Sequence, residues 1–112
     1  YLTTASIGAS TTAYSSTNEL AATGNYTSGG ATVTNATAPT SSGTTAYWTP
    51  SASVSWTSFT SSGAFDAVLF YNSSQSNKAI AALTFSSQSI TSGTFSLTMP
   101  TNDSSNALIR LT

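Results

Sequence analysis

The chain has 112 residues, of which 38% are hydrophobic and only 4% are charged, and its formal net charge is -1. This length fits one domain with a real hydrophobic core. Two basic residues cannot neutralise a run of phosphates, so the composition excludes nucleic acid as a partner. The chain contains no cysteine, which excludes disulfides and thiolate metal sites, and no apolar run approaches the length of a membrane span.

Serine and threonine make up about 40% of the chain, far above their average usage. Disordered chains combine low hydrophobicity with high net charge, and the 2 Trp, 5 Tyr and 5 Phe of this chain argue against disorder. We therefore expect a folded domain whose surface is hydrated through hydroxyl groups instead of charges. Little charge repulsion keeps copies of such a surface apart, so association is easy for it.

The first third of the chain predicts short elements. Residues 2–7 are compatible with a first strand, and residues 18–22 are compatible with one helical turn that Gly24 ends. After a turn at Gly29 and Gly30, "ATVTNATA" at 31–38, which includes Asn35, alternates with threonine in the manner of a strand. The composition of "PTSSG" at 39–43 predicts a loop.

The middle of the chain holds the strongest strand patterns. Pro50, within residues 45–60, marks a strand edge, a bulge or a break between two strands, since proline removes a donor from the hydrogen-bond ladder. The apolar runs at 64–71 and 78–86 are joined by "NSSQSN", a connection of the length expected in a hairpin. Because the first run is apolar on both faces, we expect these two strands to be central.

The last part predicts two further strands. "GTFSLTMP" at 93–100 sends Phe95, Leu97 and Met99 to one side, "TNDSSN" forms a turn, and "ALIRLT" closes the chain. Seven or eight strands at intervals of about ten residues predict an all-β fold, a single-domain antiparallel β-sandwich, jelly-roll-like or barrel-like, over residues 1–112. Because the chain opens at Tyr1 and not at methionine, we expect a short N-terminal arm to have been removed or not included.

The residue types needed for common catalytic sites are missing. Without histidine and cysteine, the Ser-His-Asp and Cys-His arrangements are excluded. Lys78 does not complete a Ser-x-x-Lys motif, because Gln75 occupies the serine position. We therefore predict that the chain is not an enzyme and has no catalytic residues and no cofactor.

The three carboxylates, Glu19, Asp66 and Asp103, are scattered along the chain. Their spacing identifies neither a glycosidase pair nor a calcium loop, so no metal site is predicted. Asp66 stands in a mostly apolar strand, where a carboxylate must be exposed, hydrogen-bonded or paired. It either faces solvent at a strand end, forms a structural ion pair with Arg110 or Lys78, or is functional.

Three aromatic residues, Tyr47, Trp48 and Trp56, are candidates for contact with a partner or a glycan. They could form a platform on which a sugar ring stacks. Packing in the core or in a subunit interface is the more frequent role of such side chains, and we favour it.

Several stretches in order along the chain resemble a family of small virion proteins of tailed bacteriophages, including phages of aquatic bacteria. These are "NEL", "GNYTSGGATV", a tryptophan in a threonine-rich strand, "AVLFYN", "KAIAALTF", "SGTFSLTMP" and "LIRL". The similarity spans most of the chain. Two departures are Asn25, which stands between Gly24 and Tyr26, and Asp66, where a basic residue is expected.

The resemblance implies a structural part of a virion. Its most specific form is a capsid decoration (cement) protein on the outer surface of the head, which bridges major capsid protein subunits and forms a homo-oligomer, with a trimer favoured. A tail or fibre component is the alternative within the virion, and a carbohydrate-binding or adhesin module is the alternative outside it. Neither nucleic acid nor a membrane is expected as a partner.

Overall fold

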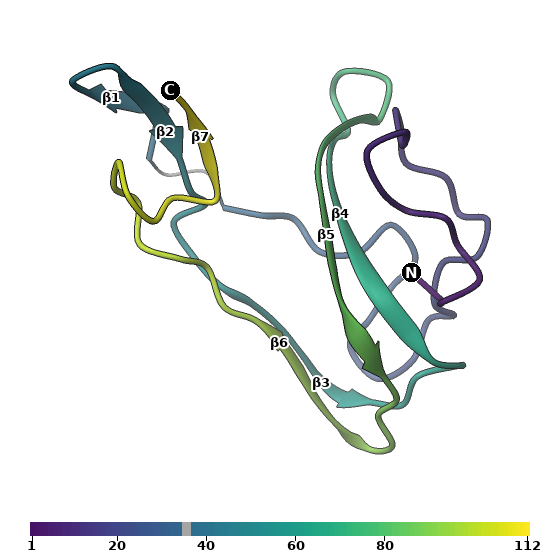
Figure 1. Cartoon of the computed structure of the whole chain (residues 1–112). Coiled ribbons are helices and arrows are strands. Elements are labelled where there is room, and N and C mark those ends of the chain that lie inside the picture. Colours follow the sequence, from purple (N-terminus) through teal and green to yellow (C-terminus); the bar gives the residue numbers. More distant parts are fainter. Residues whose placement is uncertain (35–36) are drawn as a thin grey trace. The chain divides into compact units, whose positions relative to one another are not determined.

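The computed structural model describes residues 1–34 and 37–112, and within them the chain is all-β without a helix (Figure 1). Three antiparallel sheets have the strand orders β1-β2-β7, β3-β6 and β4-β5. The seven strands are β1 (Thr40–Ser42), β2 (Thr45–Trp48), β3 (Val54–Phe59), β4 (Phe65–Asn72), β5 (Lys78–Gln88), β6 (Gly93–Leu97) and β7 (Ile109–Leu111). The all-β prediction is confirmed, while none of the described sheets closes into a barrel.

The chain forms two compact units, each built from two separate segments. Unit 1 comprises residues 1–30 and 57–94, and unit 2 comprises residues 31–56 and 95–112. β3 and β6 begin in one unit and end in the other. The expectation of one domain over residues 1–112 stays a prediction.

The predicted hairpin is confirmed as β4 and β5, which pair antiparallel from Asn72 opposite Lys78 to Phe65 opposite Gln88. The prediction that these are central strands is wrong, because among the described strands they form a two-stranded sheet of their own. Both faces of β4 are covered, because Phe65, Ala67 and Phe70 are all buried although they do not share one parity. Two register shifts interrupt the pairing. The shift between Phe70 and Tyr71 leaves Ile80 without a paired residue on β4.

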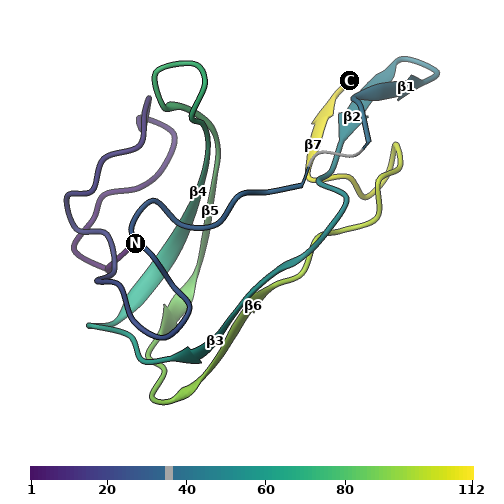
Figure 2. The ribbon, with the colours of Figure 1, turned by 180° about the vertical axis from the view of Figure 1, so that it is seen from behind.

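Residues 1–30 run beside this hairpin without forming a described strand of their own (Figures 1 and 2). Leu2 bridges Phe65 on one side of the hairpin, and Ala13 bridges Lys78 on the other. The strand predicted at residues 2–7 is wrong, because the Ala5 amide turns back to the Leu2 carbonyl at 2.8 Å. The helical turn predicted at 18–22 is also wrong; Asn18 adopts φ 59°, which a right-handed helix does not allow.

Aromatic rings form the core of unit 1. Phe59 and Phe65 are each 1% exposed and meet edge to face at 5.9 Å. Phe65 contacts Phe85 of β5 in the same way, and Phe59 contacts Tyr26 of the N-terminal segment, also at 5.9 Å in each case. This chain of rings joins β3, β4, β5 and the loop around Tyr26 into one core.

Unit 2 contains the small sheet β1-β2-β7. The loop predicted at 39–43 is wrong for residues 40–42, because Thr40–Ser42 is a strand that turns through Gly43, at φ 58°, into β2. The break at Pro50 is confirmed, since β2 ends at Trp48 and β3 begins at Val54. Of the strand predicted at 31–38, residues 31–34 and 37–38 are not in a strand, and Asn35 lies outside the described residues.

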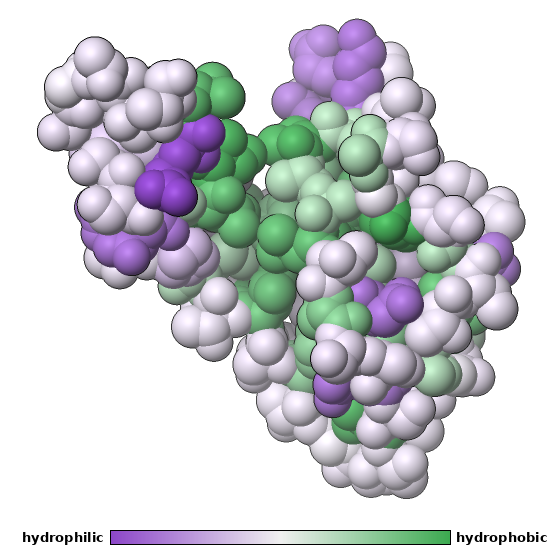
Figure 3. All heavy atoms as spheres, viewed as in Figure 1, coloured by the Kyte–Doolittle hydropathy of each residue, from purple (hydrophilic) through white to green (hydrophobic). Residues whose placement is uncertain are grey.

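Hydroxyl groups replace charges in the hydrogen bonding and on the surface. Buried Thr49 accepts the Leu108 amide at 2.9 Å, and Ser55 of β3 bonds Ser96 of β6 at 2.9 Å. Most of the surface in Figure 3 is pale, the colour of weakly polar residues, and strongly hydrophilic atoms form only small areas. This agrees with the hydroxyl-rich surface that the composition predicts.

Candidate functional site

The densest group of polar contacts in unit 1 surrounds the carboxylate of Glu19. The Tyr14 hydroxyl donates to Oε2 at 2.8 Å, and the Tyr26 hydroxyl donates to Oε1 at 2.6 Å. The Gly29 backbone amide also donates to Oε1, at 2.7 Å. Three donors at these distances stabilise a half-buried carboxylate without a basic side chain.

Tyr71 connects this group to the hairpin. Its hydroxyl donates to the Gly29 carbonyl at 2.8 Å, and its ring stacks on that of Tyr14 at 4.6 Å with an interplanar angle of 16°. We refer to Glu19, Tyr14, Tyr26, Gly29 and Tyr71 as the Glu19 cluster. Through Tyr71, this cluster ties the segment 14–29 to β4.

Local turns bring these residues together. The Glu19 amide donates to the Ser16 carbonyl at 3.2 Å, and Thr23 and Tyr26 bridge each other around Gly24. Gly24 at φ 56° and Gly29 at φ 89° occupy the left-handed region that glycine adopts at little cost. The glycines of "GNYTSGG" thus return the chain twice toward Glu19.

The carboxylate changes the acidity of both phenols. The hydrogen bond to Glu19 raises the pKa of Tyr14 to about 12, with burial as the second cause. The pKa of Tyr26 is raised more than that of Tyr14, first by burial and then by the hydrogen bond to Glu19. Ionising either phenol would place a second negative charge beside the carboxylate, so both stay protonated at neutral pH. The cluster is suited to holding a loop in place.

Asp66, the second residue of β4, is half-buried, and its amide donates to the Tyr1 carbonyl at 3.2 Å. The predicted alternative of a pair with Lys78 is wrong. Asn72 lies opposite Lys78, so Asp66 stands six residues, about 20 Å, from that end of the hairpin.

The pair between Asp66 and Arg110 stays a prediction, since the two residues belong to different units. Arg110 donates to the Ser104 carbonyl at 3.4 Å. Hydrogen bonds from Asn106 and Ser105 lower the pKa of Asp103, and the Arg110 charge adds to this.

The three candidate aromatics belong to unit 2. Tyr47 and Trp48 are on β2, opposite Arg110 and Ile109 of β7, with Tyr47 half-buried. Trp56 is buried and stacks on Phe95 at 5.7 Å, with an interplanar angle of 13°. For Trp56 this packing favours the core interpretation over a sugar-stacking platform.

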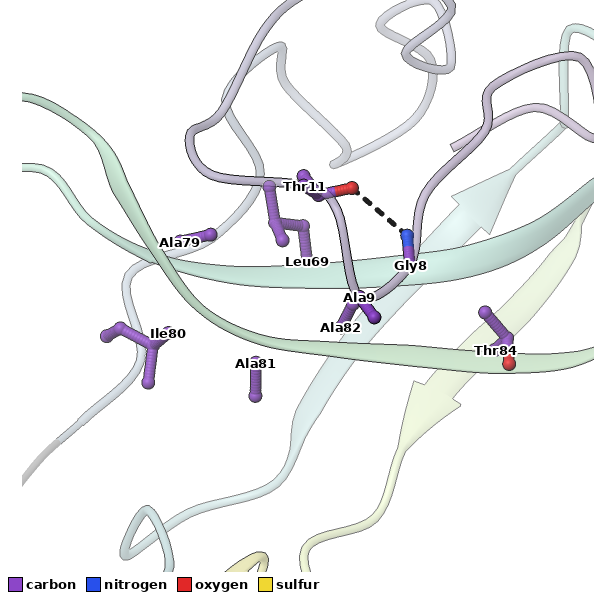
Figure 4. A pocket seen from close by; sticks show the side chains of 9 residues that line it. All are labelled: Gly8, Ala9, Thr11, Leu69, Ala79, Ile80, Ala81, Ala82 and Thr84. Atoms are coloured by element: carbon purple, nitrogen blue, oxygen red, sulfur yellow. Dashed lines mark hydrogen bonds between the residues drawn. The ribbon is translucent and has the colours of Figure 1, made fainter.

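A hollow of 410 Å³ lies between the loop at 8–11 and the hairpin (Figure 4). Thr11 closes the loop by accepting the Gly8 amide at 3.0 Å, and Leu69, Ala82 and Thr84 are among the lining residues of β4 and β5. The lining contains no charged side chain, so the hollow offers no counter-charge to an ionised group.

The described residues contain neither a metal-binding group nor a membrane-spanning helix. No group of three histidine, cysteine or carboxylate residues there could hold a metal ion. In the same residues, no helix is long and apolar enough to span a membrane.

Sequence reasoning missed the Glu19 cluster. Tyr14, Glu19 and Tyr26 lie within 13 consecutive residues that contain no basic side chain. A carboxylate in such a stretch needs other donors, and this was the available signal. Tyr71 comes 52 residues after Glu19, and only the fold brings it there.

No protein-family model, curated protein or solved structure matches the chain.

Proposed function

We propose that this chain is a non-enzymatic structural protein of a bacteriophage virion. Two sequence features support the proposal: the ordered motifs that resemble small phage virion proteins, and the absence of histidine and cysteine. The sparsely charged, hydroxyl-rich surface supports it independently, because such a surface associates with little electrostatic cost.

The observation that carries the proposal is the composition of the Glu19 cluster. Glu19 comes from "NEL", Tyr26 and Gly29 from "GNYTSGG", and Tyr71 from "AVLFYN". These are stretches on which the resemblance rests, and their side chains hydrogen-bond to each other and to the backbone. Motif residues that hydrogen-bond to one another in this way hold a loop in a fixed position. This is expected of a protein whose task is to present a surface.

Within this proposal, the chain is a capsid decoration protein on the outer surface of the head, and it bridges major capsid protein subunits as a homo-oligomer. The three sheets assemble into the β-sandwich that the strand pattern predicts. A tail or fibre location is the alternative within the particle.

The proposal is tested by measuring the composition of purified particles of the phage that encodes the chain. Quantitative mass spectrometry is expected to find the chain in a fixed ratio to the major capsid protein. Antibody labelling in electron micrographs then separates head from tail. Absence from purified particles, with the chain abundant in the lysate, would refute a virion role.

The carbohydrate-binding alternative now rests on Tyr47 and Trp48, because Trp56 is buried. A glycan array separates the two functions. Specific binding that is lost in Trp48→Ala, while the variant keeps its fold, would favour the carbohydrate role over the virion role.

A further inference from the structure

Two tyrosine rings from distant parts of the chain are stacked within unit 1. The rings of Tyr14 and Tyr71 have centroids 4.6 Å apart and planes inclined by 16°. The Tyr14 hydroxyl donates to Glu19 Oε2, and the Tyr71 hydroxyl donates to the Gly29 carbonyl, each at 2.8 Å. Because the Gly29 amide donates to Glu19 Oε1 at 2.7 Å, the hydroxyl ends of the two rings are anchored to neighbouring acceptors.

This stack suits the coupling of two phenols. A phenol that loses one electron and its hydroxyl proton becomes a phenoxyl radical, and the unpaired electron is shared with the ring carbons next to the oxygen. Two phenoxyl radicals in contact join through these carbons. Because Tyr14 and Tyr71 are already held in contact, coupling within the chain should be faster than coupling between chains.

Glu19 supplies the base that the first oxidation needs. Tyr14 is a neutral phenol at neutral pH, since its hydrogen bond to Glu19 raises its pKa to about 12. Its electron therefore leaves readily when the hydroxyl proton leaves with it. The carboxylate oxygen at 2.8 Å lies close enough to accept that proton directly. The acceptor of Tyr71 is a backbone carbonyl, a far weaker base, so Tyr14 is oxidised first.

The remaining tyrosines lie in different surroundings. Tyr26 also donates to Glu19, at 2.6 Å, but its ring meets Phe59 edge to face at 5.9 Å. The Tyr1 hydroxyl donates to a backbone carbonyl at 2.6 Å, and Tyr47 belongs to unit 2. Tyr14, in contrast, combines a carboxylate acceptor with a stacked second phenol.

We propose that Tyr14 and Tyr71 form an oxidative cross-linking site, which a one-electron oxidant from outside the chain converts to dityrosine. One oxidant molecule takes an electron from Tyr14, whose hydroxyl proton passes to Glu19 and then to water. A second oxidant molecule takes an electron from Tyr71, whose hydroxyl proton is released to water. The two radicals form a carbon–carbon bond, and the hydrogen on each joined carbon moves to the phenol oxygen. Each cross-link thus reduces two oxidant molecules and releases two protons.

The new bond would fix the segment 14–29 covalently to β4, where the Glu19 cluster holds it through hydrogen bonds. A covalent link between distant residues restricts the unfolded chain, so the cross-linked protein should have a higher melting temperature. The site lies within one chain and needs no particle. Its test is therefore separate from that of the virion role.

The test illuminates the purified full chain with a ruthenium tris-bipyridine complex and persulfate, which together generate a one-electron oxidant. The expected product is a monomer that shows dityrosine fluorescence and has lost two hydrogen atoms in mass. A protease that cleaves after glutamate and aspartate places Tyr14 in the peptide 1–19 and Tyr71 in the peptide 67–103. Mass spectrometry should find these two peptides joined.

Variants separate the two tyrosines from the others. Tyr14→Phe and Tyr71→Phe should each abolish the joined peptides, whereas Tyr1→Phe and the matched control Tyr47→Phe should keep them. Glu19→Gln should slow the rise of dityrosine fluorescence about a hundredfold, the lower end for a positioned base. A high concentration of phosphate buffer should restore much of that rate, which a merely structural role of Glu19 would not allow.

Three outcomes would overturn the site: no joined peptides, joined peptides that persist in Tyr14→Phe, or a yield that rises in proportion to the chain concentration. An unchanged rate in Glu19→Gln would refute the role of the carboxylate. Circular dichroism checks that each variant is folded. Should a variant fail to fold, fragmentation of the joined peptides from the unmodified chain decides, and a bond at any tyrosine other than Tyr14 and Tyr71 refutes the assignment.

Discussion

At the scale of single residues, one carboxylate holds together the segment 14–29, which Tyr71 ties to β4. Glu19 accepts three hydrogen bonds from neutral donors, two of them phenols. Hydrogen bonds to a charged acceptor each contribute about 1.5–3 kcal/mol. In a chain with five charged side chains, this is the charge whose removal should matter most for the fold.

Glu19→Ala leaves both phenols and the Gly29 amide without their acceptor, and it should lower the free energy of unfolding by about 2–3 kcal/mol. Glu19→Gln keeps one acceptor oxygen, and its amide can donate to the Tyr14 hydroxyl, so the expected loss is about 1 kcal/mol. Urea unfolding measures both. Asp103→Asn is the control, because it removes the same charge but keeps the Oδ1 that accepts the Ser105 and Asn106 amides. Equal small losses in all three variants would contradict a stabilising role of the Glu19 cluster.

The raised phenol pKa values predict a loss of stability at high pH. The pKa of Tyr14 is about 12 in the folded chain and about 10 in the unfolded chain. The contribution of Tyr14 to the free energy of unfolding is therefore complete below about pH 10. That contribution is lost as the pH rises from about 10 toward 12, and Tyr26 acts in the same direction.

Unfolding free energies measured across this range should fall, and the Tyr14→Phe, Tyr26→Phe double variant should flatten the dependence. A flat profile for the unmodified chain would count against the cluster.

At the scale of elements, the loop at 23–26 docks on β3 where the strand is irregular. Ser58 of β3 has φ 53°, and the Asn25 side chain accepts the Thr57 amide at 2.6 Å. A Cβ on Gly24 would lie 2.1 Å from the Ser58 carbonyl oxygen. The loop can therefore approach β3 only because residue 24 has no side chain.

Gly24→Ala should destabilise the chain by about 2–4 kcal/mol, since both the φ of 56° and the contact with Ser58 oppose a side chain. Gly8→Ala is the matched control, because a Cβ added there would meet nothing within 4 Å and the change should be nearly neutral. Thermal unfolding of the two variants gives the comparison. A melting temperature for Gly24→Ala as high as that of the control would show that the loop does not dock this way.

The hairpin supplies a second test at this scale. Phe65→Ala removes a ring that is 1% exposed and should cost about 3–5 kcal/mol. Leu83→Ala removes a half-buried side chain and should cost about 2 kcal/mol, the lower end for leucine. A larger loss of unfolding free energy for Leu83→Ala than for Phe65→Ala in denaturant melts would show that the core does not lie on the face of Phe65.

Sequence patterns located six of the seven described strands and missed β1. β3, β4, β5 and β6 show alternating or continuous apolar residues, and all four were predicted. β1 is Thr-Ser-Ser with every side chain exposed, so no burial pattern marked it. At residues 2–7 an apolar Leu2 and Ile7 suggested a strand, but a tight turn after Leu2 interrupts the extended backbone.

At the scale of the whole molecule, the sequence predicted the class and most of the strands, but not the division into two compact units. Strand patterns indicate which residues pair and are buried, whereas the grouping of segments such as 1–30 with 57–94 depends on contacts between distant parts of the chain. The Glu19 cluster was out of reach for the same reason, since Tyr71 joins it across 42 residues from Gly29.

Under the proposed virion role, the chain attaches to a particle through neutral contacts. Five charged side chains cannot supply many ion pairs, and exposed ion pairs contribute little in any case. Attachment should come from apolar contacts, sheet edges and water-bridged hydroxyls, with the polar loops at 21–30 and 39–46 and the start of the chain as the expected contact regions.

The most direct test is to incubate particles with the chain at about 0.1 M and about 1 M sodium chloride, over which the Debye length falls from about 10 Å to about 3 Å. The measured quantity is the fraction of the chain that sediments with intact particles. We expect the same fraction at both concentrations, because few charges are neutralised on binding. Release of the chain at high salt, from particles that remain intact, would contradict it and show that charge on the partner dominates the attachment.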